Sequence, residues 1–69
     1  MLNPELAQIA QDVIAEMREE GVWSEDEIQW STCGVVLKHC EAQGLLSEGE
    51  PSFSEIAGIT ALVEQVMKE

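Results

Sequence analysis

The sequence predicts an all-α protein, a small three-helix bundle whose helices span residues 4–20, 25–43 and 53–68. In each segment, apolar residues recur at spacings of three and four, which is the pattern of an amphipathic helix. Capping residues precede each segment, and glycine follows the first two, as expected at helix boundaries. No segment shows the strict alternation of apolar and polar residues that marks a strand. At 69 residues, the chain should form a single helical domain.

The segment 4–20 has a clear start and end. Asn3 is a favourable N-cap, and Pro4 follows at the first helical position, where its missing N–H costs nothing. Gly21 is expected to end the helix in the left-handed conformation. The predicted inward stripe consists of Leu6, Ile9, Ala10, Val13, Ile14 and Met17.

The segment 25–43 is the most broadly apolar. Ser24 and Glu27 have the spacing of a capping box, and Gly44 is suited to end the helix. The predicted stripe is Cys33, Val36, Leu37 and Cys40, flanked by Trp30 on one side and by Ile28, Thr32 and Val35 on the other. One neighbouring helix cannot cover a surface this wide. The helix therefore needs two partners: both other helices, or one of them and a second subunit that completes the bundle by self-association.

The connections set the arrangement of the helices. Because only residues 21–23 separate the first two helices, these should form an antiparallel hairpin. The second connection is longer and holds the turn formers Gly49 and Pro51. Ser52 is the predicted cap of the third helix, with Ser54 as a competing cap. The predicted inward stripe of this helix is Ile56, Ile59, Thr60, Val63, Val66 and Met67, and Leu62 falls outside it.

The chain is strongly acidic, with 14 Asp and Glu residues against three Lys and Arg residues and a net charge of −11. This charge repels nucleic-acid phosphates and anionic membranes, and it favours solubility or a basic partner. No segment approaches the ~18 apolar residues of a membrane span, and the first residues lack the basic start of a signal peptide. Cys33 and Cys40 lie about 10 Å apart along one helix, too far for a disulfide within it. Free thiols suit a reducing compartment, so we expect a cytoplasmic protein.

Six carboxylates form the densest charge cluster, at the junction of the first two helices. These residues, called the acidic pole below, are Glu16, Glu19, Glu20, Glu25, Asp26 and Glu27. Arg18 is the only base among them, and antiparallel helices would bring Glu64 and Glu69 to the same end. Glu19 and Glu20 stand at a helix C-terminus, where the helix dipole makes a carboxylate unfavourable. The pole is therefore a docking surface for a basic protein, a mimic of nucleic-acid phosphates, or a solvated end that keeps a small domain soluble.

Trp30 and Leu62 are the two candidate apolar contacts for a partner. Trp30 lies at the edge of the apolar band of its helix, near Leu37 and Glu41. Core packing is the first expectation for this residue, and a binding anchor is the alternative, because large aromatic side chains at such a rim are frequent anchors. Leu62 is a candidate because it falls outside the inward stripe of the third helix.

No catalytic, cofactor-binding or metal site is predicted. His39 and Cys40 diverge by about 100° around the helix, and Cys33 is seven residues away, so the three cannot share one tetrahedral ion. The same divergence prevents His39 from serving as general base for either thiol. The sequence also lacks a glycine-rich phosphate loop, the EF-hand spacing and the Asp-Ser-Leu motif that carries an acyl-carrier prosthetic group.

These observations favour a non-enzymatic protein–protein interaction or regulatory module, whose partner is a basic protein or a second copy of the chain. A nucleic-acid mimic that inhibits a DNA- or RNA-binding protein is the alternative, and its binding would collapse with added salt. A winged-helix-like DNA binder is a third hypothesis, but the helix 25–43 offers only Lys38 and His39 as cations for phosphates. Direct binding to nucleic acid or to a membrane is therefore not expected.

Overall fold

The computed structural model describes residues 3–46 and 51–69, and within them the chain forms three helices and no strand. The helices are α1 (Pro4–Glu20), α2 (Glu25–Ala42) and α3 (Phe53–Lys68). The predicted all-α class is confirmed, and the helix bounds differ from the prediction only at the end of α2, by one residue. The predicted turn residue Gly49 lies outside the described residues.

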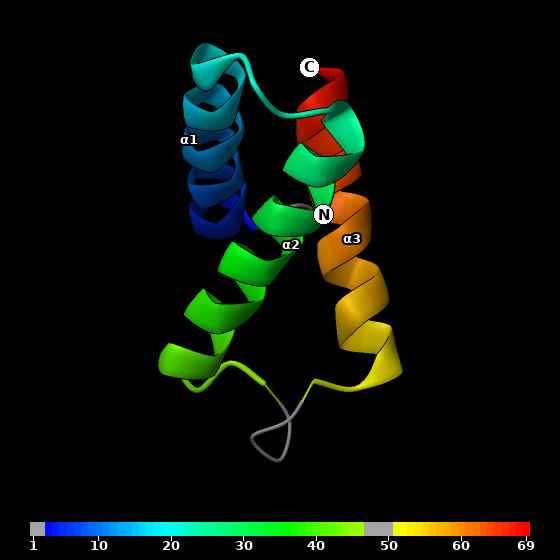
Figure 1. Cartoon of the computed structure of the whole chain (residues 1–69). Helices are drawn as coiled ribbons and strands as arrows, with labels where there is room; N and C mark the ends of the chain where they lie inside the picture. The colour runs from blue at the N-terminus through cyan, green and yellow to red at the C-terminus, as the bar shows by residue number, and fades with distance from the viewer. Residues whose placement is uncertain (1–2, 47–50) are drawn as a thin grey trace.

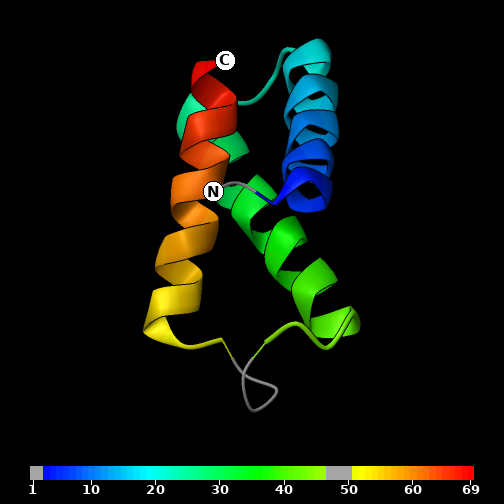
Figure 2. The same ribbon diagram turned by 180° about the vertical axis from the view of Figure 1, so that it is seen from behind.

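α1 and α3 stand side by side, and α2 crosses both of them obliquely (Figure 1). Seen from behind, α2 runs from the C-terminal part of α3 toward the start of α1 (Figure 2). Every pair of helices is in contact. Both other helices therefore cover α2, which is one of the two arrangements that the width of its apolar surface predicts. None of the described helices combines the length and the apolar character that crossing a membrane requires.

Capping interactions define the helix boundaries. Asn3, Ser24 and Ser52 accept hydrogen bonds from backbone N–H groups in the first turns of α1, α2 and α3. Ser24 and Ser52 each belong to a complete capping box, so the competing residue Ser54 is not the cap of α3. α1 ends at Gly21, whose φ of 72° is left-handed and favours glycine.

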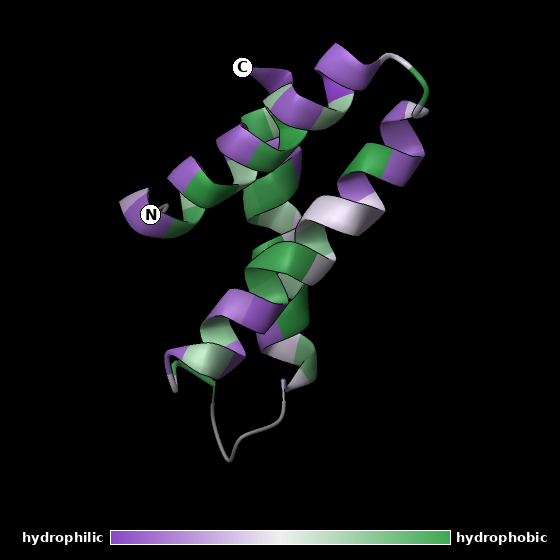
Figure 3. Cartoon of the chain, turned by 60° about the vertical axis from the view of Figure 1, so that its left-hand side comes forward, coloured by the Kyte–Doolittle hydropathy of each residue, from purple (hydrophilic) through white to green (hydrophobic). Residues whose placement is uncertain are grey.

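The core lies where the three helices meet, and the hydrophobic positions gather there (Figure 3). Its buried members are Ala10 and Ile14 from α1, Ile28, Val36 and Cys40 from α2, and Ile59, Leu62, Val63 and Val66 from α3. Thr32 is buried among them, and its Oγ1 donates a 2.6 Å hydrogen bond to the carbonyl oxygen of Ile28. The hydroxyl is thereby satisfied without leaving the apolar interior.

α2 buries a stripe that is slightly rotated from the predicted one. Ile28, Thr32, Val36 and Cys40, each four residues from the next, are the buried residues of α2. Of the four residues predicted to be central, Val36 and Cys40 are buried, but Cys33 and Leu37 are only half-buried. A ridge of residues four apart is a common packing element for helices that cross obliquely, as α2 does here.

The prediction for α3 is wrong at two positions. Leu62, expected to fall outside the inward stripe, is 6% exposed, whereas Ile56, expected inside it, is 46% exposed. The apolar arc of α3 is broad: Leu62 stands at one edge, and Ile56 lies about 120° away from it around the helix. Helical periodicity locates such an arc but not the edge that faces a neighbour. Because α3 contacts both α1 and α2, its buried arc is turned toward Leu62.

Candidate interaction surface

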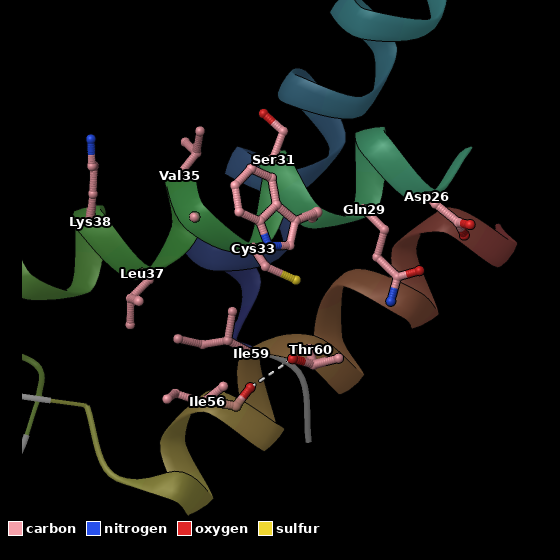
Figure 4. A pocket seen from close by; sticks show the side chains of 12 residues that line it. Asp26, Gln29, Ser31, Cys33, Val35, Leu37, Lys38, Ile56, Ile59 and Thr60 are labelled. Carbon is pink, nitrogen blue, oxygen red and sulfur yellow. Dashed lines mark hydrogen bonds between the residues drawn. The ribbon is translucent and has the colours of Figure 1, made fainter. Parts of the chain in front are cut away.

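A groove of about 650 Å³ runs between α2 and α3 (Figure 4). Its apolar lining includes Trp30, Cys33, Val35 and Leu37 from α2 and Ile56 and Ile59 from α3. Asp26 and Lys38 also line it, and they lie toward its two ends. We call this feature the α2–α3 groove. It is an apolar surface with one acid and one base at its ends.

Exposed apolar side chains surround the groove. Trp30 is 83% exposed, and Ile56 and Val35 are 46% and 40% exposed. Phe53, at the start of α3, is 87% exposed but is not among the lining residues. Scattered exposed apolar residues are ordinary, whereas a contiguous patch rimmed by polar groups marks an interaction surface. The α2–α3 groove has the second character.

The position of Trp30 follows from helix geometry. It is two residues from Ile28 and two from Thr32, both buried, so it points about 160° away from each of them around the helix. In the close view, Cys33 and Leu37 point toward α3 (Figure 4). Trp30 therefore has no position in the core, so the first expectation, core packing, is wrong, and Trp30 is a surface residue.

The two thiols lack the properties of nucleophiles. Burial raises the pKa of the Cys33 thiol; a hydrogen bond with Thr60 partly offsets this, and the charge of Glu64 raises the pKa further. Burial also raises the pKa of Cys40, and the charge of Glu55 adds to the shift. Both cysteines are free, and at neutral pH both are protonated thiols.

His39 interacts with α1 and not with either thiol. His39 Nε2 lies 3.2 Å from Glu5 Oε1, so the ring joins the end of α2 to the start of α1. Among the described residues, no three His, Cys, Asp or Glu side chains are grouped to hold a metal ion.

The acidic pole is partly a structural junction. Arg18 Nη2 lies 2.7 Å from Glu25 Oε1 and 3.4 Å from the backbone oxygen of Met67. This one guanidinium thus joins the end of α1, the start of α2 and the end of α3. Glu69 lines a small hollow together with Arg18, which agrees with the predicted approach of the C-terminus to the pole.

Three of the six carboxylates of the acidic pole have partners within the chain. Glu25 pairs with Arg18, whose hydrogen bond lowers the pKa of the carboxyl group. Glu27 accepts the backbone N–H of Ser24 at 2.8 Å, and this bond lowers its pKa. Glu20 accepts a hydrogen bond from the indole nitrogen of Trp23. The other three, Glu16, Glu19 and Asp26, are exposed.

The structure thus separates the predicted partner-binding residues into three groups. Trp30 and Asp26 line the α2–α3 groove, and the remaining acidic residues lie at or near the junction of α1 and α2. Leu62 belongs to the core and is removed from the candidate surface. Ile56 and Gly34, which sequence reasoning did not select, do line the groove. Gly34 could have been identified from the sequence, because it is a glycine inside a predicted helix and lies one turn from Trp30.

No protein-family model, curated protein or solved structure matches this chain.

Proposed function

We propose that this protein is a non-enzymatic protein–protein interaction module, and that it binds another polypeptide through the α2–α3 groove. The observation that carries the proposal is Trp30, a large aromatic residue that is 83% exposed at an apolar groove. Tryptophan is among the residues that dominate the binding energy of protein interfaces. The protein would have a regulatory role if the binding of a partner to this groove were controlled.

The energetics of the groove fit a binding anchor. An aromatic side chain buries about 150–250 Å² on docking, which at about 25 cal/mol per Å² stabilises a complex by roughly 4–6 kcal/mol before the costs of association. Ile56 and Val35, both partly exposed beside the groove, would add apolar contact. Trp30 is therefore expected to dominate the affinity.

The contacts of the acidic residues favour the groove over the acidic pole as the binding surface. Glu20, Glu25 and Glu27 serve the fold through hydrogen bonds or an ion pair, which leaves fewer carboxylates to imitate a row of phosphates. The net charge of −11 still selects against acidic partners and favours partners with neutral or basic surfaces.

The chemistry of the groove supports a binding role rather than catalysis. Its one thiol, Cys33, has a raised pKa, and His39 is engaged with Glu5. The free thiols also support a reducing compartment, which agrees with a cytoplasmic location for the module.

A capture experiment tests the proposal. The immobilised wild-type chain, Trp30→Ala and the matched control Phe53→Ala are exposed to a lysate of the source cells in 50 mM and 500 mM salt, and retained polypeptides, including the chain itself, are identified by mass. We expect the wild type and Phe53→Ala to retain the same polypeptide in both salts, and Trp30→Ala to lose it. The proposal would be contradicted if a polypeptide were retained equally by Trp30→Ala, were lost in 500 mM salt and depended on Glu16 and Glu19. This result would favour the nucleic-acid mimic.

A further inference from the structure

Four residues of α2 form a ridge on its outward face. Asp26, Trp30, Gly34 and Lys38 follow one another at spacings of four, all are exposed, and all line the α2–α3 groove. We call them the outward ridge. Ridges of residues four apart are the elements that two helices most commonly pack together. The outward ridge is thus a packing surface that none of the three helices covers.

The outward ridge is complementary to itself when read in the opposite direction. If two copies of α2 lie antiparallel across a two-fold axis at the level of Thr32, Asp26 of one copy faces Lys38 of the other, and Trp30 faces Gly34. The acidic Asp26 then lies against the basic Lys38, and the large side chain of Trp30 lies against Gly34, which has no side chain. In a parallel pair, Asp26 would face Asp26 and Trp30 would face Trp30.

We infer that the polypeptide bound by the groove is a second copy of this chain, docked through an antiparallel pair of α2 helices. The inference rests on the proposed function and names its partner. In a two-fold dimer the same patch serves both subunits, so each favourable pair occurs twice. The indole of each copy lies over Gly34 of the other and fills the apolar groove beside it.

Gly34 supports this arrangement because the isolated chain gives no reason for it. A Cβ at this position would meet no atom within 4 Å, and its φ is not left-handed. Glycine inside a helix is less stable than alanine, and it is favoured where another group must approach the backbone closely. The indole of a second copy is such a group.

The distribution of charge favours the antiparallel direction. Each copy carries a net charge of −11, and the acidic pole lies at the start of α2. α2 is about 27 Å long at 1.5 Å per residue, and the screening length in 0.1 M salt is about 10 Å. Antiparallel helices place the two acidic poles at opposite ends of the dimer, beyond that length. Two further acids lie on the outward face: Glu27 is turned back to Ser24 by its hydrogen bond, and the exposed Glu41 lies beyond Lys38, near the end of α2.

The area required is available. A stable interface buries about 800 Å² on each partner, roughly a sixth of the 4793 Å² that the chain exposes. To reach this area, the dimer would have to cover the outward ridge together with the partly exposed Val35 and Ile56.

Sedimentation equilibrium with charge-reversal variants tests the register. We expect the wild type to have twice its 7.6 kDa chain mass at micromolar concentrations. Asp26→Lys and Lys38→Asp should each raise the dissociation constant at least tenfold, and the double variant should restore it. An equimolar mixture of the two single variants should form heterodimers. Single reversals without effect would overturn the antiparallel register.

Matched variants test the packing. Trp30→Ala and Gly34→Gln should each weaken the dimer at least tenfold while the helical circular dichroism signal persists. Gly58→Gln, at the other helix-interior glycine with open space, should leave the dimer unchanged because Gly58 does not line the groove. A monomer at every concentration, or a dimer indifferent to Trp30 and Gly34, would overturn the inference.

The two proposals fail in different ways. If the chain is monomeric but the capture experiment retains a different polypeptide that depends on Trp30, the proposed function stands and the second-copy inference falls. If neither self-association nor capture depends on Trp30, both fall.

Discussion

The two faces of α2 have the same residue spacing, but one face is buried in the core and the other is exposed. The inward face carries Ile28, Thr32, Val36 and Cys40, and the outward ridge carries Asp26, Trp30, Gly34 and Lys38, each set repeating every four residues. The inward set is 0–4% exposed, whereas Trp30 alone is 83% exposed. A helix therefore shows two candidate packing ridges, and only the contacts of the other helices reveal which one is used within the chain.

The two faces differ in how much their residues contribute to the stability of the fold. The inward face contains only residues that pack or that satisfy their own polar groups, as Thr32 does. The outward ridge combines a large apolar residue in water with a glycine that weakens the helix. Neither residue is expected to stabilise the isolated chain, and for this reason we propose that they serve a contact beyond it.

The largest expected effect comes from placing the same charge on each face. Val36→Asp should unfold the chain, because Val36 is fully buried and an unpaired carboxylate there costs several kcal/mol in a domain of marginal stability. Trp30→Asp should change the unfolding free energy by about 1 kcal/mol or less. Circular dichroism at 222 nm distinguishes the two; equal loss of signal would refute the assignment of faces.

A second pair of variants extends the comparison to α3. Leu62→Ala should lower the unfolding free energy by about 2–5 kcal/mol, as truncation of a buried leucine usually does, whereas Ile56→Ala should lower it by less than about 1 kcal/mol. Urea unfolding in the Trp30→Ala background, where the chain is expected to be monomeric, measures both. The reverse order would restore the inward stripe that helical periodicity predicts.

A smaller effect, of opposite sign, is expected on the outward ridge. Gly34→Ala in the Trp30→Ala background should stabilise the chain by about 0.5–1 kcal/mol, because alanine is the better helix former and its Cβ meets open space. Gly58→Ala is the matched control and should behave alike. If Gly34→Ala destabilises the chain in urea unfolding, the glycine has a role within the monomer.

The smallest effect concerns the junction at which α2 starts. Arg18 holds the pKa of Glu25 below its ordinary value of 4.5, so the folded chain binds this proton less readily than the unfolded chain. Stability from the pair is therefore complete above that value and is lost as the pH falls through the lower folded-state pKa. Glu25→Gln should flatten the dependence of the thermal midpoint on pH below about 5. An unchanged slope would show that the pair contributes nothing.

Most of the fold and part of the candidate surface could be predicted from the sequence. The capping boxes at Ser24 and Ser52 and the left-handed Gly21 were predictable because caps depend on residues close together in the chain. The orientation of α3 was not, since Leu62 and Ile56 belong to one broad apolar arc, and only the packing of the neighbouring helices decides which of them is covered. Trp30 was identified as a candidate contact, but the groove beside it needs α3 to form its other wall.

The residue pattern alone determined the helical class, the helix bounds and the excess of apolar surface on the central helix, because these follow from local hydrogen bonding and periodicity. Only the tertiary structure decided which part of that surface is left over, because burial depends on the packing of helices far apart in the chain. It also decided that Arg18 joins Glu25 to the end of α3, since the contact of Arg18 with the backbone oxygen of Met67 spans 49 residues of sequence.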